Sequence, residues 1–290
     1  MTDSILPFML EKSSLRGRMI TLDHVLDQIM VAHNYPESVS ALLSEAATLA
    51  VLLGSTLKYQ GIFTLQIQTE GRLQILVSDF TSEGDLRACA QLKDSGENQV
   101  PLLGKGYVAF TVDQGEHTER YQGIVELKDG PLVESVQSYF LQSEQIRTGI
   151  SMAAAKVAGA WKARAVLLQD MPEEGGNAPS GEAQAFSESE EHWRRSMMLL
   201  QTCTQEELLD GSLSAPELLF RLFHEEGVRV FDERRVQKNC RCTMEKIRGV
   251  LSSLSADEIH DLVLDNKISV KCEFCSHEYI FNPAEIGDNK

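Results

Sequence analysis

The sequence predicts an α+β protein in which an N-terminal antiparallel sheet packs with helices, followed by a helical linker region and a small C-terminal domain with four cysteines. Three observations predict this class. Apolar residues alternate with polar ones in five short segments between residues 62 and 127, and such short connections favour antiparallel neighbours. Apolar residues at helical spacing lie before and after these segments. Two cysteine pairs lie near the end of the chain, so we expect an N-terminal α+β core domain at 1–172, a helical linker at 173–239 and a cysteine domain at 240–290.

The elements of the N-terminal domain can be assigned in order. A helix is expected over 21–33, with Thr21 as a plausible N-cap, and a second helix opens at Pro36 and is stopped by Gly61. Five strands with a period of two follow, at 62–68, 73–77, 86–90, 107–112 and 121–127. The stretch 132–140 has a helical pattern, whereas 153–168 mixes an alanine-rich start with an apolar end and its state stays open.

A boundary is expected between residues 170 and 191. This stretch holds seven acidic residues, no Lys or Arg, two prolines and three glycines, and it has too little apolar area to offset the entropy of ordering it. We therefore expect a flexible segment there.

Three short helical units follow the boundary. The first covers about 190–203, and capping boxes begin the other two at Thr204 and Ser214. A brief strand is expected at 228–231. These units are apolar on one side, which favours helices packed on the larger domain, but the pattern alone does not exclude helices that are only loosely held.

The composition limits the classes of function. The chain has 290 residues, of which 42% are hydrophobic, and 27 basic against 43 acidic residues give a formal charge of -16. That charge repels nucleic acid and anionic membrane surfaces, so we expect neither as a partner. The first residues lack the pattern of a signal peptide, and no apolar run is long enough to span a membrane. We expect a cytoplasmic protein, in which reducing conditions keep thiols free.

The cysteine pairs point to a metal. Cys240 and Cys242 are followed, after 29 residues, by Cys272 and Cys275. Zinc binds four thiolates tetrahedrally, and a tight turn around each pair can aim two sulfurs at one point. The Cys-x-x-Cys spacing is usual for such sites and the Cys-x-Cys spacing is less common. His260 and His277 are alternative ligands in principle, although four cysteines already complete the shell.

Magnitudes indicate that zinc dominates the stability of the C-terminal domain. So short a domain rarely gains more than about 3 to 5 kcal/mol from its core, whereas a structural zinc contributes on the order of 10 to 16 kcal/mol. We therefore expect the domain to be folded with Zn²⁺ and largely unfolded without it. Helices are expected over 244–254 and 256–264, and strands over 268–271 and 277–281. Neighbouring cations can offset the charge of the thiolates, namely Lys238, Arg241, Lys246, Arg248 and Lys271.

The same cysteines leave two roles open. Thiolates are the form that peroxide or hypochlorous acid attacks first, so the site is a potential redox sensor. A permanent zinc staple without switching has the same spacing. Of the two other cysteines, Cys89 falls in a strand and is expected to be a buried core thiol, and Cys203 is expected to be a bystander.

Several further segments make the sequence resemble the 33 kDa chaperonin family, the bacterial redox-regulated holdase chaperones of the heat-shock class. Besides the cysteine pairs, the resemblance is carried by Leu15–Arg18, His33–Pro36, Lys58–Gly61, Thr64–Gln68, Leu103–Gly106, Arg120–Val125, Ser138–Gln145, Val270–Cys275 and Tyr279–Phe281. It covers nearly the whole chain and is weakest over 150–190.

The resemblance implies a function for each part. In the reduced state the protein is expected to be an inactive monomer with zinc bound by the four cysteines. Under oxidation combined with unfolding conditions, the family implies that Cys272 pairs with Cys275, that Cys240 pairs with Cys242, and that zinc leaves. The metastable linker then loses its order and the protein, now a homodimer, captures unfolding client proteins without ATP.

The linker also supplies candidate client-binding residues. Methionine and aromatic side chains form adaptable apolar surfaces once they are released. The candidates are Trp193, Met197, Phe220 and Phe223, with Met198, Leu199 and Leu219 beside them.

Two other classes compete with this interpretation. A constitutive zinc-stapled interaction or adaptor module would need a basic face, and 240–290 contains no sustained basic run. A thiol oxidoreductase would place Cys272 at a helix N-terminus in a thioredoxin-like unit, whereas strand-like sequence lies on both sides. Common hydrolase and nucleotide-binding patterns are absent from the sequence, so we do not expect an enzyme.

Overall fold

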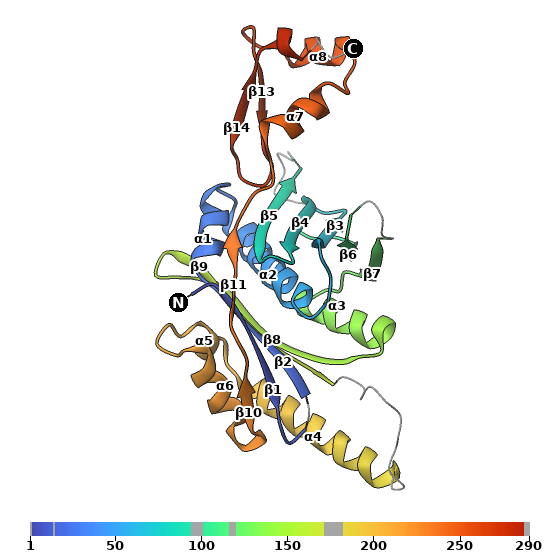
Figure 1. Cartoon of the computed structure of the whole chain (residues 1–290), viewed down its shortest axis with the longest axis vertical. Coiled ribbons are helices and arrows are strands. Elements are labelled where there is room, and N and C mark those ends of the chain that lie inside the picture. Colours follow the sequence, from blue (N-terminus) through green and yellow to red (C-terminus); the bar gives the residue numbers. More distant parts are fainter. Residues whose placement is uncertain (1, 14, 94–100, 116–119, 171–181, 287–290) are drawn as a thin grey trace. The chain divides into compact units, whose positions relative to one another are not determined.

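The computed structural model describes residues 2–13, 15–93, 101–115, 120–170 and 182–286, with the side chains of 182–188 left aside. The chain divides into two compact units, residues 1–238 and 239–290 (Figure 1). The α+β class and the antiparallel pairing expected from the sequence are confirmed, but the N-terminal part holds two sheets where one was expected.

Unit 1 contains two six-stranded sheets. The first has the order β10-β1-β2-β9-β8, with β11 also paired to β1, and the second has the order β12-β5-β4-β3-β6-β7. All neighbours are antiparallel except β12 and β5. The strands of the first sheet are β1 Ser4–Leu10, β2 Leu15–Leu22, β8 Arg147–Val157, β9 Ala160–Asp170, β10 Val228–Val230 and β11 Arg234–Arg235. Those of the second are β3 Ile62–Thr69, β4 Leu73–Thr81, β5 Asp85–Leu92, β6 Gly106–Asp113, β7 Tyr121–Glu126 and β12 Gln237–Lys238.

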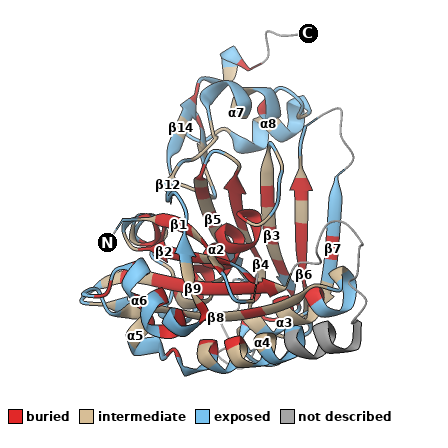
Figure 2. Cartoon of the chain, turned by 60° about the horizontal axis from the view of Figure 1, so that its bottom comes forward, coloured by how far each residue is buried: buried red, intermediate tan, exposed pale blue. Residues whose placement is uncertain are grey.

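Helix α2 (Glu37–Gly54) lies between the two sheets and contacts strands of both. It is an apolar helix whose residues from Ala46 to Gly54 are all buried, and it is the centre of the larger hydrophobic core (Figure 2). Its length and composition would suffice to cross a membrane, but 72% of that stretch is buried inside the unit, as in the core helix of a globular protein. Helices α1 (His24–Val31) and α3 (Leu132–Tyr139) flank it, and α3 continues as the π-helix η1 (Phe140–Glu144).

A second core lies on the other face of the first sheet. It is covered by α4 (Glu182–Thr202), α5 (Gln205–Leu209), α6 (Ala215–Phe223) and the short 3-10 helix η2 (His224–Glu226). Strand β9 is buried on both faces, because Ala165 and Leu167 belong to the larger core while Val166 and Leu168 belong to the second one. The helices of the predicted linker are therefore packed on the N-terminal sheet in this structure.

The capping boxes expected at the starts of α5 and α6 are both present. The hydroxyl of Thr204 accepts a hydrogen bond from the Glu207 backbone N–H, and the Glu207 carboxylate accepts one from the Thr204 backbone N–H. Ser214 and Glu217 make the same pair of hydrogen bonds. The predicted flexible boundary falls partly on 171–181, which lie outside the described residues. Its later part is helical, because α4 already begins at Glu182.

Two predicted helix ends are wrong. Thr21 belongs to β2, where it pairs with Arg164 of β9, and α1 begins only after Asp23, whose backbone N–H donates to Asp3 Oδ1 at 2.6 Å. Helix α2 ends at Gly54 rather than near Gly61. There the hydroxyl of Ser55 donates to the Leu52 carbonyl at 2.7 Å, so the side chain satisfies a helix-end acceptor locally.

The segment 153–168, left open by the sequence, forms strands β8 and β9. They are joined by a two-residue turn in which Ala158 (φ 51°) and Gly159 (φ 90°) both have positive φ, as a primed hairpin turn requires. The five strands expected between 62 and 127 are confirmed as β3 to β7, with ends that differ by a few residues.

Unit 2 is small. It consists of α7 (Met244–Leu251), α8 (Ala256–Leu262), a hairpin of β13 (Ile268–Lys271) and β14 (Glu278–Phe281), and the 3-10 helix η3 (Pro283–Glu285). Among its described residues, the core holds four buried apolar side chains: Leu251, Ile268, Phe281 and Ile286. So few buried side chains agree with the expectation that the core alone supplies little stability.

Candidate metal centre

The four cysteines lie on two turns of unit 2. Cys240 and Cys242 lie just before α7, whose N-cap Thr243 accepts from the Lys246 backbone N–H at 3.2 Å. Cys272 and Cys275 lie in the turn between β13 and β14. That turn is closed by the Cys272 N–H, which donates to the His277 carbonyl at 2.9 Å, and Ser276 takes the left-handed φ of 58°. A helix cap and a hairpin turn thus position the two cysteine pairs.

The structure brings all four sulfurs to one point. Their Sγ atoms lie within 4.8 Å of one another, with 3.7 Å between Cys240 and Cys272 and 3.5 Å between Cys242 and Cys275. Tetrahedral zinc with Zn–S bonds of about 2.3 Å places its sulfurs roughly 3.8 Å apart. A disulfide needs about 2.05 Å instead. The arrangement can hold a metal ion, and its donor set of four thiols suits a thiophilic one.

Tyr279 of β14 is a further part of this site. Its hydroxyl donates to Cys242 Sγ at 3.2 Å and lies 3.3 Å from the Cys242 carbonyl oxygen. Burial alone would raise the pKa of Cys242, but the hydrogen bond from Tyr279 and those from the other thiols lower this pKa to about 7. Burial, reinforced by hydrogen bonds to the neighbouring thiols, raises the pKa of Cys275 to about 12. The strand pattern located Tyr279, but nothing in the sequence indicated that its hydroxyl reaches a cysteine.

Other groups considered in the sequence take different positions. Neither His260 nor His277 joins the cluster among the described residues, and the His277 ring instead lies against Tyr279 with 4.6 Å between centroids. Lys238 donates to the Gln28 carbonyl at 3.0 Å within unit 1. In unit 2, Lys246 Nζ donates to the Arg241 carbonyl at 3.0 Å, beside the first cysteine pair.

The candidate client-binding residues lie on helices α4 and α6. Phe223 is fully buried and its ring stacks on Phe8 with 6.2 Å between centroids. Trp193 and Met197 are partly buried against the same core. Phe220, three residues before it on α6, is 64% exposed. Three of the four therefore lie at least partly inside the interface between linker and sheet, and only an opening of that interface would free them fully.

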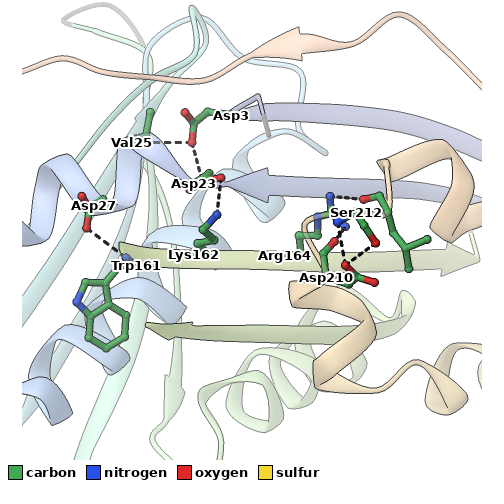
Figure 3. Close-up of polar contacts among 10 residues, drawn as sticks. Asp3, Asp23, Val25, Asp27, Trp161, Lys162, Arg164, Asp210 and Ser212 are labelled. Atoms are coloured by element: carbon green, nitrogen blue, oxygen red, sulfur yellow. Dashed lines mark hydrogen bonds and ion pairs between the residues drawn. The ribbon is translucent and has the colours of Figure 1, made fainter. Parts of the chain in front are cut away.

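Two buried charges make polar contacts here, Arg164 across this interface and Glu226 within the linker, and the sequence reasoning missed both. Arg164 of β9 is 2% exposed and donates to the Leu213 carbonyl at 2.7 Å and the Asp210 carbonyl at 3.5 Å (Figure 3). Glu226 is 1% exposed and accepts from Arg195 of α4 at 2.6 and 2.9 Å, which lowers the pKa of Glu226. A lone arginine within the apolar run of β9 was the available signal, because a buried cation needs acceptors from a neighbouring element.

The two remaining cysteines belong to unit 1. Cys89 is half-buried in β5. Cys203 is buried at the end of α4, where burial, followed by the charge of Glu207, raises the pKa of its thiol to about 11. Cys203 is therefore kept as an unreactive thiol while the linker is packed.

Comparison with known proteins gives consistent matches over the whole length. The family model described as Hsp33 protein matches residues 3–282. A 33 kDa chaperonin of Caulobacter vibrioides is 34% identical, with 97% of this chain and 95% of the relative covered, and that of Salmonella typhi is 33% identical, with 99% and 94% covered. The crystal structure of the 33 kDa chaperonin (heat shock protein 33 homolog) from Thermotoga maritima has the same fold. Its TM-score is 0.80 at 20% identity, covering 98% of this chain and 96% of that one.

Proposed function

The chain belongs to the Hsp33 family of chaperones, and we propose that it is a redox-regulated, ATP-independent holdase that is inactive when reduced and active when oxidised. The observation that carries this proposal is the convergence of four thiols from two turns in a unit with a very small core. A unit built in this way depends on its thiols for order. Chemical change at the thiols therefore has a structural consequence.

We propose Cys240, Cys242, Cys272 and Cys275 as the ligands of Zn²⁺ in the reduced protein. A bound zinc ion would join the two cysteine turns and favour the thiolate form of all four side chains. Tyr279 would then orient Cys242 through its hydrogen bond, as outer-shell groups commonly do.

Oxidation removes these ligands. When hypochlorous acid is the oxidant, two thiolates lose two electrons to form one S–S bond, and the acid is reduced to chloride and hydroxide. We propose that Cys272 pairs with Cys275 and Cys240 with Cys242, as the family resemblance implies. A sulfur in a disulfide is a poor zinc ligand, so unit 2 loses its main source of order.

We propose that disorder in unit 2 releases the linker. The proposed boundaries are a core domain at 1–172, the linker at 173–239 and a switch domain at 240–290. Strand β12 at the end of this range pairs with β5 directly before the first cysteine turn, so disorder in unit 2 begins next to the linker's last contact with the sheet. Opening of the interface would expose Trp193, Met197 and Phe223 together with the sheet face beneath them. These apolar surfaces would hold unfolding client proteins.

The proposal also includes the location, the oligomeric state and the partners of the protein. We propose a cytoplasmic protein, a monomer when reduced and a homodimer when active, without nucleic acid or membrane as partners. The net charge of -16 supports the exclusion of these polyanionic surfaces.

The test compares the reduced, zinc-loaded protein with the same protein after hypochlorous acid treatment. Light scattering of a chemically unfolded client follows holdase activity, and a variant with Ser at all four cysteines serves as the control. Suppression of aggregation by the oxidised but not by the reduced wild type is the expected result, whereas the Ser variant, which lacks the four thiols, should behave the same with and without hypochlorous acid. Equal suppression by the reduced and oxidised wild type would point to a constitutive module instead.

A further inference from the structure

Three arginines lie on the same face of the first sheet. Arg16 and Arg18 are alternate residues of β2, and Arg234 belongs to β11 on the other side of β1. Ile5 of β1 is opposite Arg234, and Pro7, two residues further along β1, is opposite Arg18. Residues that are directly opposite each other, or two apart along a strand, point to the same side of a sheet. The three arginines therefore share the face on which Ile5 joins the larger core.

Within the ranges that the structure describes, no carboxylate oxygen lies within 4.0 Å of any of the three guanidinium groups. Arg18 donates to the Gly17 carbonyl at 2.9 Å, and Arg234 donates to the Ser82 carbonyl at 2.7 Å. The carboxylate of Glu83, beside Ser82, accepts from the Ser82 hydroxyl at 2.8 Å instead of pairing with an arginine. A guanidinium group has five N–H donors, so most donors of this cluster stay available to a ligand.

The three positive charges repel one another across the boundary of the proposed linker. Arg16 and Arg18 belong to the proposed core domain, whereas Arg234 belongs to the linker. Burial lowers the pKa of Arg18, and the charges of Arg16 and Arg234 lower this pKa further, so the three groups are close enough to interact. The C-terminal end of α2, next to Thr56, contributes only about -0.5 of an elementary charge, which is too little to balance three full charges. In a chain with a net charge of -16, such a local excess of positive charge favours an anionic ligand.

A small cavity lies beside two of these arginines and has a volume of about 50 Å³. Its lining consists of Arg16, Gly17, Arg18, Thr56, Leu167 and Gln169. One water needs about 10–15 Å³ of such volume, so the cavity has room for roughly four waters or one small tetrahedral oxyanion, but not for a nucleotide. The Thr56 hydroxyl donates to the Leu53 carbonyl at 2.7 Å, and Gln169 Nε2 donates one of its two N–H groups to the Thr148 hydroxyl at 3.2 Å. The free donors of the lining are therefore those of the two arginines and one amide N–H.

We propose that this cavity binds one inorganic phosphate ion, which Arg16 and Arg18 contact directly and which Arg234 attracts from the linker side. The fork of a guanidinium group matches two phosphate oxygens at once. With the ion bound, the repulsion between Arg18 and Arg234 is replaced by the attraction of both to one anion, so the ligand favours the packed linker. Phosphate would therefore oppose the opening of the linker. This effect on opening rests on the proposed function, whereas binding of the ion does not.

The first experiment measures phosphate binding by isothermal titration calorimetry of the full-length, reduced and zinc-loaded protein, in a chloride buffer of constant ionic strength. Arg16 is exposed, and within the described ranges its side chain makes no hydrogen bond, so Arg16→Gln removes a charge and little else. Arg16→Gln and Arg18→Gln should each weaken binding about tenfold, the size expected for one charge-assisted hydrogen bond. Arg194→Gln, at an exposed position of α4, is the matched control and should bind as the wild type does.

The second experiment follows native-state amide hydrogen exchange over residues 228–238 of the same proteins. At a phosphate concentration of ten times Kd, exchange through linker opening should slow about elevenfold relative to chloride at the same ionic strength, because only the packed form binds the ion. In Arg16→Gln the slowing at that concentration should fall to about twofold, as a tenfold weaker affinity requires. In chloride alone this variant should exchange no faster than the wild type, since it has lost one of three like charges, whereas loss of a merely structural arginine would speed exchange.

Two results would overturn the phosphate site. One is equal exchange of the wild type in phosphate and in chloride, and the other is phosphate binding that neither Arg16→Gln nor Arg18→Gln weakens. Activation by hypochlorous acid is scored separately through client aggregation. Its failure would refute the redox-regulated holdase while leaving the binding of phosphate as measured, so the two proposals fail independently.

Discussion

Replacing Phe223 by alanine should loosen the linker without touching a single cysteine. The side chain is fully buried between α6 and the first sheet and stacks on Phe8, which is 1% exposed. Loss of its transfer free energy and the cavity left behind together cost about 3 to 5 kcal/mol for a buried phenylalanine. If the linker opens as a unit, that cost raises the population of the open form about a hundredfold or more.

Helix α6 supplies the matched control. Phe220 lies three residues earlier and is 64% exposed, so Phe220→Ala should change stability by no more than about 0.5 kcal/mol. The assay is native-state amide hydrogen exchange over residues 205–226 of the reduced, zinc-loaded proteins, with zinc content measured in parallel. Exchange should accelerate in Phe223→Ala alone, and this variant should suppress some client aggregation before oxidation. Equal exchange in the two variants would refute the view that packing of α6 holds the linker closed.

Three further predictions follow from single contacts. Burial raises the pKa of Cys203 to about 11, and this pKa should return toward ~8.5 when oxidation opens the linker. Cys203 should then react with iodoacetamide on the order of a hundredfold faster, because more of it is thiolate. Equal labelling of Cys203 before and after oxidation, measured by mass spectrometry, would contradict this. Tyr279→Phe removes the donor to Cys242 and should lower zinc affinity about tenfold in competition with a chromophoric chelator, whereas unchanged affinity would show that the contact is incidental. The hydrogen bond from Arg195 lowers the pKa of Glu226 in the folded state. The pair therefore stabilises the packed linker fully at pH values above the unfolded-state pKa of ~4.3, and this stabilisation is lost as the pH falls through the folded-state pKa of Glu226. Hydrogen exchange of the linker should therefore accelerate below about pH 4 in the wild type, and an identical acid response in Glu226→Gln would rule this carboxylate out as the cause.

The sequence predicted elements best where one face is buried and the other is solvated. The alternation in β3 to β7 and the capping boxes at Thr204 and Ser214 identified real strands and helix starts, because each pattern is set by contacts within a few residues. Strand β9 gave no such pattern. Cores lie on both of its faces, so its apolar residues run together, and its hairpin turn uses Ala158 where asparagine or glycine is usual.

In the candidate site, too, local patterns were predicted and tertiary contacts were not. Spacing identified the four cysteines, since metal ligands must come in close pairs on turns, but it could not place Tyr279, which reaches Cys242 only because the β13–β14 hairpin folds back. The linker was harder to judge. Its apolar stripes fitted both packed and loose helices, and the contacts that decide for packing come from Phe8 and Arg164, distant residues whose approach depends on the tertiary fold.

The most direct test of the redox switch is a titration of the reduced, zinc-loaded protein with hypochlorous acid in one cuvette. Released zinc is followed with a chromophoric chelator while light scattering reports aggregation of an unfolding client. Loss of the four thiol ligands is proposed to release the linker, so suppression of client aggregation should rise in proportion to the zinc released. Complete zinc release with the client aggregating as fast as it does in buffer alone would contradict the account.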